Sequence, residues 1–157
     1  MRPVYETADD REREEMVANA VSAHFRVDLE REDKLASNDY RLVKDGKVFA
    51  LLEVKFRRGY NWTDLRFMGS YMLSFEKWWA LWKLCQSNDL ALCLAVSDKL
   101  SEIWASTWRG SIPLYDVSDG GRRDRNDKKD IEPCVFIPID EFDILIKDRE
   151  LTEPKRG

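Results

Sequence analysis

The pattern of apolar and polar positions predicts a helix near the start of the chain, from about residue 8 to residue 25. At roughly 100° per residue, one side of this helix collects four apolar residues and two acids. They are Val17, Ala18, Val21 and Phe25, together with Asp10 and Glu14. The acids lie either where the apolar stripe runs past the edge of the core or where the helix borders a functional site.

Two strands joined by a hairpin are predicted next, over residues 38–43 and 47–57. A three-residue loop over 44–46 separates them and contains a glycine, which tolerates the positive φ of such turns. The middle of the second stretch is apolar except at Glu53 and Lys55, which is typical of a strand covered on both faces. This strand is therefore expected to be central in its sheet.

The remaining sequence predicts a second helix over about 72–87, with Ser74 as its N-cap. Further strands are expected over 90–97, 102–108 and 135–139, and residues 26–32 are a candidate for one more. Residues 116–132 have the composition of a loop, and residues 142–146 are expected to form a closing turn or helix. The order of elements predicts an α/β fold in which a small mixed sheet is flanked by helices.

Length and composition are those of a single domain over residues 1–157. Hydrophobic residues make up 43% of the chain, with six Trp and seven Phe, which favours a packed core and argues against disorder. The longest apolar run, Leu90–Val96, is far short of the ~20 residues of a spanning helix, so no membrane partner is expected. An apolar signal segment near Met1 is absent, which favours a cytoplasmic location.

Cysteine, histidine and charge limit the chemistry that the chain can perform. Three cysteines without CxxC spacing argue against a disulfide framework, and a single histidine excludes a His-rich metal site. Any catalysis must therefore rely on carboxylates and lysines. The formal net charge of −4 argues against broad, non-specific coating of nucleic acid. Two local clusters, at residues 55–66 and 122–129, are nevertheless basic.

Glu53 and Lys55 are unusual because they occupy alternate positions, and hence one face, of an otherwise apolar strand. Taken alone, they are most simply explained as an ion pair at the end of a sheet. Asp39 changes this interpretation. The predicted hairpin places Asp39 opposite Leu51, one diagonal step from Glu53 and on the same face.

Two carboxylates that converge beside a lysine form a site suited to a hard divalent cation. Asp39 and Glu53 would repel each other unless a cation lay between them. Mg²⁺ takes oxygen ligands of this kind and keeps several of its waters. Lys55 is then placed to orient or deprotonate a water, or to offset the charge that develops on a phosphate. The pattern predicts a metal-dependent phosphodiesterase.

The sequence resembles the PD-(D/E)xK nuclease superfamily in one short motif. Asn38-Asp39 is followed, after thirteen intervening residues, by Glu53-Val54-Lys55, and a helix is predicted on either side. The resemblance covers about residues 6–108 and implies a restriction-endonuclease-like αβββαβ core, with residues 109–150 as a C-terminal extension. The superfamily includes restriction enzymes, Holliday-junction resolvases and phage-type nucleases. Position 38 is Asn rather than Pro, a departure that many members share.

This resemblance also implies roles for the residues of the motif. Asp39 and Glu53 would bind the metal, with the main-chain carbonyl of Val54 as a third ligand. Lys55 would serve the attacking water. The expected cofactor is Mg²⁺, for which Mn²⁺ is expected to substitute.

Two further residues are implied on the helices. Glu14 matches the acid that many members carry on their first helix, and its carboxylate is expected to point toward Asp39, with Asp10 as the competing candidate. Lys77, on the second predicted helix, matches a basic residue that some members direct at the site or at the phosphate. It is therefore included among the candidate catalytic residues.

Cations and aromatic residues after the motif are candidates for contacts with DNA. They are Arg57, Arg58, Tyr60 and Arg66 in the first basic cluster, and Arg122 and Arg123 in the second. The alternative interpretation is that these are ordinary loop and core residues, or a solvated charged loop.

Together, the residues and the resemblance predict a Mg²⁺-dependent DNA endonuclease, and the resemblance implies the phage type. The expected cleavage is either structure-selective or weakly sequence-specific, because the chain is too short for a separate recognition domain. A homodimer is expected, and the stretch containing Trp78, Trp79 and Trp82 is either core or a candidate interface. The alternative is a catalytically weak module on the same fold that binds nucleic acid or protein.

Overall fold

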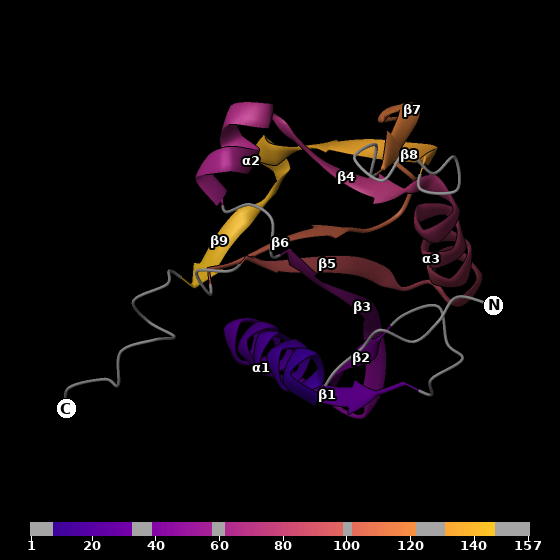
Figure 1. Ribbon diagram of the computed structural model, residues 1–157. Coiled ribbons are helices and arrows are strands. Elements are labelled where there is room, and N and C mark those ends of the chain that lie inside the picture. Colours follow the sequence, from indigo (N-terminus) through magenta and orange to yellow (C-terminus); the bar gives the residue numbers. More distant parts are fainter. Residues whose placement is uncertain (1–7, 33–38, 58–61, 99–101, 122–130, 147–157) are drawn as a thin grey trace.

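The computed structural model contains two β-sheets and describes residues 8–32, 39–57, 62–98, 102–121 and 131–146 (Figure 1). The larger sheet has six strands, in the order β1 (Asp28–Arg31), β2 (Tyr40–Lys44), β3 (Lys47–Arg57), β5 (Ala91–Asp98), β6 (Ile103–Trp108) and β9 (Asp143–Ile146). The smaller sheet has three, in the order β4 (Ser70–Ser74), β8 (Ile131–Pro138) and β7 (Asp116–Gly121).

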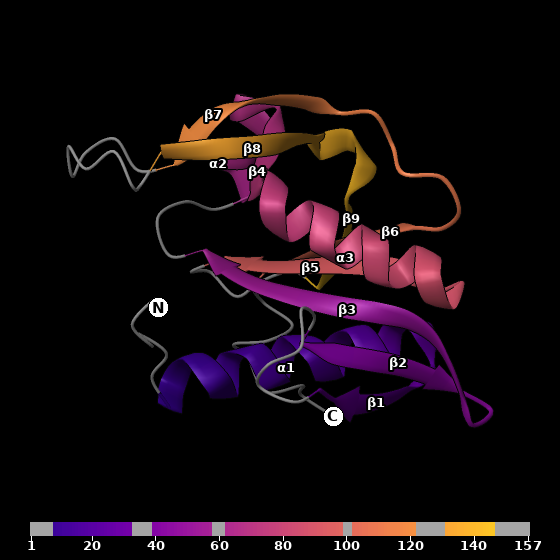
Figure 2. The ribbon, with the colours of Figure 1, turned by 90° about the vertical axis from the view of Figure 1, so that its right-hand side faces the viewer.

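Helices cover both faces of the larger sheet. Helix α1 (Ala8–Phe25) packs on one face, and α3 (Phe75–Asn88) lies between the two sheets (Figure 2). A short helix, α2 (Trp62–Met68), precedes β4. The mixed α/β class predicted from the sequence is confirmed. In the described part of the chain, no helix is both long and apolar enough to cross a membrane.

Strand β3 lies in the middle of the larger sheet and separates two hydrophobic clusters. It pairs with β2 in antiparallel and with β5 in parallel orientation, which confirms the central strand predicted from its apolar sequence. Leu52 and Val54 pack with Val17 and Val21 of α1, whereas Leu51 packs with α3 and the smaller sheet. Because side chains alternate along a strand, Glu53 and Lys55 share the face of Leu51.

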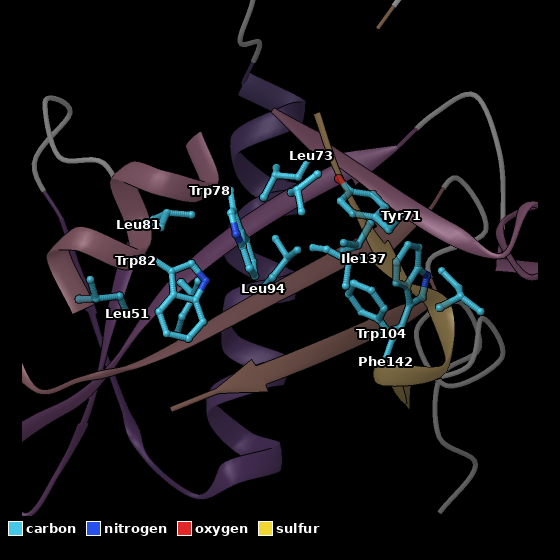
Figure 3. Close-up of a cluster of buried hydrophobic side chains, with 14 of the residues drawn as sticks. Leu51, Tyr71, Leu73, Trp78, Leu81, Trp82, Leu94, Trp104, Ile137 and Phe142 are labelled. Atoms are coloured by element: carbon cyan, nitrogen blue, oxygen red, sulfur yellow. The ribbon is translucent and has the colours of Figure 1, made fainter. Parts of the chain in front are cut away.

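The cluster between the two sheets is rich in aromatic residues (Figure 3). Trp78 packs edge-on against Trp82 and Trp108, with ring centroids 5.6 and 5.1 Å apart. Trp78 and Trp82 are 2% and 1% exposed and so belong to the core. Trp79 differs, because it is 46% exposed and stacks on Phe75. Only part of the tryptophan-rich stretch is therefore available to a partner.

The loop between β2 and β3 has two residues instead of the predicted three. Asp45 and Gly46 both have positive φ, at 52° and 78°, as the tight turns of two-residue hairpins require. Lys44 and Lys47 pair directly across this turn. A bulge follows in β3, where Phe49 is inserted between two consecutive pairs.

The prediction that Asp39 lies within a strand opposite Leu51 is wrong. Tyr40 pairs with Leu52, and β2 begins one residue after Asp39. Turn and bulge together move the register by two residues from the predicted one, and a shift of two preserves the face of a strand. If this register is continued, Asp39 comes opposite Glu53, so the error in register does not separate the two acids.

The smaller sheet is absent from the predicted architecture. Residues 116–121 and 131–132, assigned to a loop, belong to β7 and β8, and residues 143–146, assigned to a closing turn or helix, form β9. Residues 70–74 form β4, so α3 begins at Phe75 instead of about residue 72, although Ser74 is its N-cap as predicted. The candidate strand within residues 26–32 is confirmed as β1.

The segment after β6 contributes to the same core as the motif strands. Val135, Ile137 and Phe142 are buried in one cluster with Leu51 of β3 and Trp78 of α3. Strand β9 also completes the larger sheet by pairing with β6. The residues interpreted as an extension to the core are therefore integral to the packing around β3.

Candidate active site

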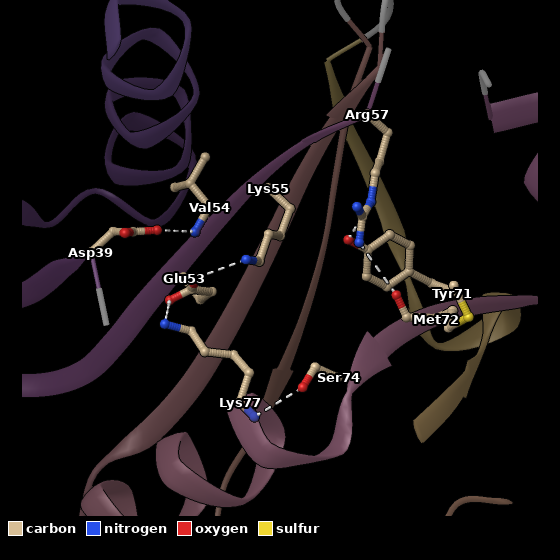
Figure 4. A network of polar contacts seen from close by, with 9 residues as sticks. All are labelled: Asp39, Glu53, Val54, Lys55, Arg57, Tyr71, Met72, Ser74 and Lys77. Atoms are coloured by element: carbon tan, nitrogen blue, oxygen red, sulfur yellow. Dashed lines mark hydrogen bonds and ion pairs between the residues drawn. The ribbon is translucent and has the colours of Figure 1, made fainter. Parts of the chain in front are cut away.

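Glu53 is the centre of a group of charged side chains on the face of β3 that is turned toward α3 (Figure 4). The residue is only 2% exposed. Its Oε1 lies 3.5 Å from Nζ of Lys55, and its Oε2 lies 3.3 Å from Nζ of Lys77. Both lysine side chains are about one-third exposed, at 32% and 30%. A buried carboxylate is thus connected to solvent through two cations.

The two lysines approach Glu53 from different elements. Lys55 is two residues further along β3, so its side chain leaves the strand on the same face. Lys77 lies in the first turn of α3, where its main-chain N–H donates to Oγ of Ser74 at 3.5 Å. Helix α3 follows directly on β4, which belongs to the smaller sheet. The group is therefore assembled from both sheets.

Asp39 is held beside β3 through both its backbone and its side chain. Its N–H donates to the carbonyl of Leu52 at 3.1 Å, and its own carbonyl accepts from the N–H of Glu32 at 3.1 Å. Its Oδ2 accepts from the N–H of Val54 at 2.8 Å. The carboxylate thus acts as an acceptor for β3 one residue before β2 begins, which fixes its position next to Glu53.

The surroundings of Glu53 favour its protonated form. Burial, followed by the charge of Asp39, raises the pKa of Glu53 from 4.5 to about 7, while Lys55 and Lys77 lower it. Desolvation and the second carboxylate therefore outweigh the two lysines. Asp39 accepts from the N–H of Val54, the residue next to Glu53, so the two carboxylates lie close enough to repel each other.

The raised pKa of Glu53 makes the stability of the metal-free protein depend on pH. An unfolded chain loses the Glu53 proton near pH 4.5, whereas the native state keeps it until about pH 7. The contribution that protonated Glu53 makes to the free energy of unfolding is therefore fully present below pH 4.5 and is lost as the pH rises through about 7. We expect urea unfolding in EDTA to record a loss of about 3 kcal/mol from this group between pH 4.5 and 8.

Other groups also titrate in this range, so the measurement is made as a difference between variants. Glu53→Gln should become more stable than the wild type as the pH rises, whereas Glu76→Gln, at an exposed position of α3, should follow the wild type. A constant difference between wild type and Glu53→Gln at all pH values would contradict the prediction.

Glu14 lies half-buried on α1, the helix that packs on the other face of the sheet. Burial raises the pKa of Tyr40 to about 12, and the charges of Glu14 and Asp39 contribute to this rise while Arg31 lowers it. Both acids are therefore within electrostatic reach of one tyrosine. A direct approach of Glu14 to Asp39 stays a prediction, and the side chain of the competing Asp10 lies outside the described part of the chain.

The predicted DNA-binding residues fall into three groups. Arg66 is exposed on α2. Arg57 is partly buried and contacts β4, because its Nε donates to Oη of Tyr71 at 2.9 Å and its Nη2 to the carbonyl of Met72 at 3.4 Å. The remaining four lie outside the described residues; they are Arg58, Tyr60, Arg122 and Arg123.

Tyr71 and Met72 were not identified from the sequence, because residue 72 was assigned to the helix. One feature of the sequence could have indicated a break before β4. Gly69, which has a positive φ of 86°, is a typical turn residue directly before Ser70. The alternate burial of Tyr71 and Leu73 is not visible in the sequence, because Met72 between them is also apolar. The helical pattern that begins at Phe75 hid this short strand.

The donor set around Glu53 fits a hard divalent cation. Asp39 and Glu53 supply two carboxylates whose mutual repulsion a dication would relieve. Over the described ranges, no three His, Cys, Asp or Glu side chains gather into a metal-binding group. The ligands besides these carboxylates would then be main-chain oxygen, such as the Val54 carbonyl, and water, which Mg²⁺ retains readily.

A mixed α/β fold that brings an Asp, a buried Glu and two lysines together agrees with what the motif implied. The model of a protein family described as "Phage putative PDDEXK endonuclease" matches residues 1–145. The chain therefore belongs to this family of the PD-(D/E)xK nucleases. A comparison with curated proteins found no match.

Proposed function

We propose that the protein is a Mg²⁺-dependent endonuclease that hydrolyses phosphodiester bonds in DNA. The observation that carries this proposal is the buried carboxylate of Glu53, which is flanked by Asp39 and by two partly exposed lysines. A purely structural ion pair would not require a second carboxylate that raises the pKa of the first. Membership of a family described as phage endonucleases supports the same reaction.

Asp39 and Glu53, with the carbonyl of Val54, would hold the metal ion, and Glu14 is the further candidate ligand. Such an ion, when bound, supplies positive charge to the scissile phosphate and lowers the pKa of a coordinated water. Helix α1, strands β1–β3, helix α3 and strand β5 would then constitute the αβββαβ core of the superfamily.

Lys55 and Lys77 supply the positive charge that the protein itself brings to the reaction. Lys55 orients the attacking water through its ammonium, which lies 3.5 Å from Oε1 of Glu53 on a side chain that is 32% exposed and so within reach of solvent. Lys77 stabilises the negative charge that develops on the phosphate in the transition state. Both are hydrogen-bond donors at fixed positions, which is the arrangement that favours the transition state over the bound substrate.

We propose cleavage that depends on DNA structure or only weakly on sequence, by a homodimer. Phe75 and Trp79 are the exposed aromatic residues of α3 that remain available for such an interface.

The experiment that tests this function combines cleavage with metal binding. Supercoiled, branched and single-stranded DNA are incubated with the protein in EDTA, Mg²⁺ or Mn²⁺, and thermal melts are recorded in the same buffers. We expect cleavage of at least one substrate with either metal and none in EDTA. We also expect the metal to raise the Tm. At a metal concentration a hundredfold above Kd, binding should increase the free energy of unfolding by about 2–3 kcal/mol. Intact DNA with unchanged melting would favour the binding module instead.

A further inference from the structure

Arg57 connects the two sheets next to the candidate active site. It lies on β3, two residues beyond Lys55 and on the same face, but its guanidinium reaches across to β4 (Figure 4). Its Nε donates to Oη of Tyr71 at 2.9 Å, and its Nη2 donates to the carbonyl of Met72 at 3.4 Å. Its Cζ also lies 5.0 Å from the centroid of the Tyr71 ring.

The partner of Arg57 on β4 is firmly held. Tyr71 is fully buried, with its ring edge-on against Trp104 and Phe142 at centroid distances of 5.6 and 6.0 Å. The opposite end of the contact is also fixed, because β3 pairs with β5 from Ala50 through Arg57 itself, which lies opposite Asp98. Arg57 therefore joins two rigid elements, and a change in this contact alters the position of one relative to the other.

The strand that Arg57 contacts is the one that delivers Lys77. Two residues after Met72, Ser74 ends β4 and caps α3 by accepting from the N–H of Lys77. Ser74 Oγ also donates to Oε2 of Glu132 on β8 at 3.5 Å, which ties the cap to the smaller sheet. Glu53 and Lys55 are carried by the larger sheet and Lys77 by the end of the smaller one, so their separation depends on contacts between the sheets.

We propose that Arg57 is a positioning residue, which sets the placement of Lys77 against Glu53 by tying β3 to β4. This inference rests on the proposed function and assigns Arg57 a different role from the DNA contact expected from its charge. The guanidinium acts through Tyr71, Met72 and the Ser74 cap. Its two hydrogen bonds to different acceptors on β4 give it a defined geometry that a lysine at this position would not reproduce.

The test is a double-mutant cycle on DNA cleavage. Tyr71→Phe removes the hydroxyl that accepts from Arg57 and keeps the ring in the core. We expect kcat to fall about 10- to 100-fold with the KM for DNA unchanged, since a small misplacement of a catalytic group has effects of this size. In a Lys77→Met background the same substitution should cause no further loss, because Arg57 acts through Lys77.

Two control variants separate this role from its alternatives. Tyr115→Phe also removes a bonded hydroxyl, which accepts from Nε1 of Trp108 at 2.8 Å and donates to Glu141. Neither partner belongs to the group around Glu53, so this variant should leave kcat unchanged. Arg57→Lys keeps the charge and should lose kcat like Tyr71→Phe. If Arg57→Lys cleaves normally while Arg57→Met weakens DNA binding and reduces its salt dependence, Arg57 is a phosphate contact and the proposal is wrong. Additive losses in the cycle would also overturn it.

A second measurement does not depend on cleavage. In metal-free protein, the side-chain NMR signals of Lys77 report its contact with Glu53. Tyr71→Phe should shift these signals toward their positions in Glu53→Gln, and Tyr115→Phe should not. If the wild type fails to cleave DNA but this shift is observed, the proposed function is wrong and the positioning role stands. Unchanged Lys77 signals in Tyr71→Phe would exclude the positioning role whatever the activity.

Discussion

Glu53→Gln is expected to abolish metal-dependent cleavage and to make the metal-free protein more stable. The variant loses a carboxylate ligand, and we expect a rate loss of at least about 10³-fold in Mg²⁺. At pH 8 in EDTA the variant should have a higher Tm than the wild type. The reason is that the surroundings of Glu53 disfavour its charged form and raise its pKa to about 7, whereas glutamine carries no charge. The rise in Tm with Mg²⁺ or Mn²⁺ should disappear.

These opposite signs distinguish a metal site from a structural ion pair. If Glu53 serves only to pair with Lys55 and Lys77, its neutralisation removes the carboxylate that both ammonium groups contact and should destabilise the protein. Glu76→Gln, at an exposed site of α3, controls for the loss of one charge and should retain both activity and the metal response. A large loss of stability for Glu53→Gln in EDTA, with no metal response in the wild type, would contradict the nuclease proposal.

Lys55→Met is the second substitution with a large expected effect. The ammonium that orients the water is removed, while the methionine stem preserves most of the packing along β3. We expect kcat to fall by about 10²- to 10³-fold, the usual effect of removing one preorganised hydrogen-bond donor, with little change in DNA affinity. Single-turnover cleavage and equilibrium binding in Ca²⁺ would measure the two quantities separately.

Lys83→Met provides the matched control, because Lys83 is an exposed lysine on the last turns of α3. It should cleave DNA at the wild-type rate. If Lys55→Met instead weakens DNA binding and leaves the single-turnover rate unchanged, Lys55 contacts the DNA backbone and does not act on the water.

Elements with strong periodicity or dense apolar sequence were predicted well. Helix α1 and strand β3 have the bounds expected from the sequence. The helix is marked by its short apolar stripe at Val17, Ala18 and Val21, and the strand by an apolar run that is covered on both faces. The juxtaposition of Glu53 with Lys55 and Lys77 also agrees with expectation. Both lysines contact Glu53, for different reasons. Lys55 lies on the same face of β3 because side chains alternate along a strand, and Lys77 lies in the first turn of α3, whose start is fixed by the cap at Ser74.

The smaller sheet could not be recognised because its strands have weak local signals. Strand β7 is Asp116–Gly121, and its Asp, Ser and Gly content is typical of a loop. It is a strand because it pairs with β8, a contact between distant segments that local sequence does not encode. For the same reason the role of Tyr71 was missed, since its importance depends on Arg57 reaching it from another sheet.

The bulge at Phe49 gives the spacing of the motif a structural meaning. If Phe49 paired with Leu42 instead of bulging, with the same two-residue turn, the register would bring Asp39 opposite Leu52, whose side chain packs toward α1. The bulge therefore absorbs the odd residue among the thirteen that separate Asp39 from Glu53 and keeps the two carboxylates on one side of the sheet. Loss of Phe49 together with the bulge would leave Asp39 opposite Glu53, so this hairpin should tolerate a change of one residue only where the bulge changes with it. Searches for distant members of the family can therefore allow an interval that is one residue shorter, in which the bulge is absent.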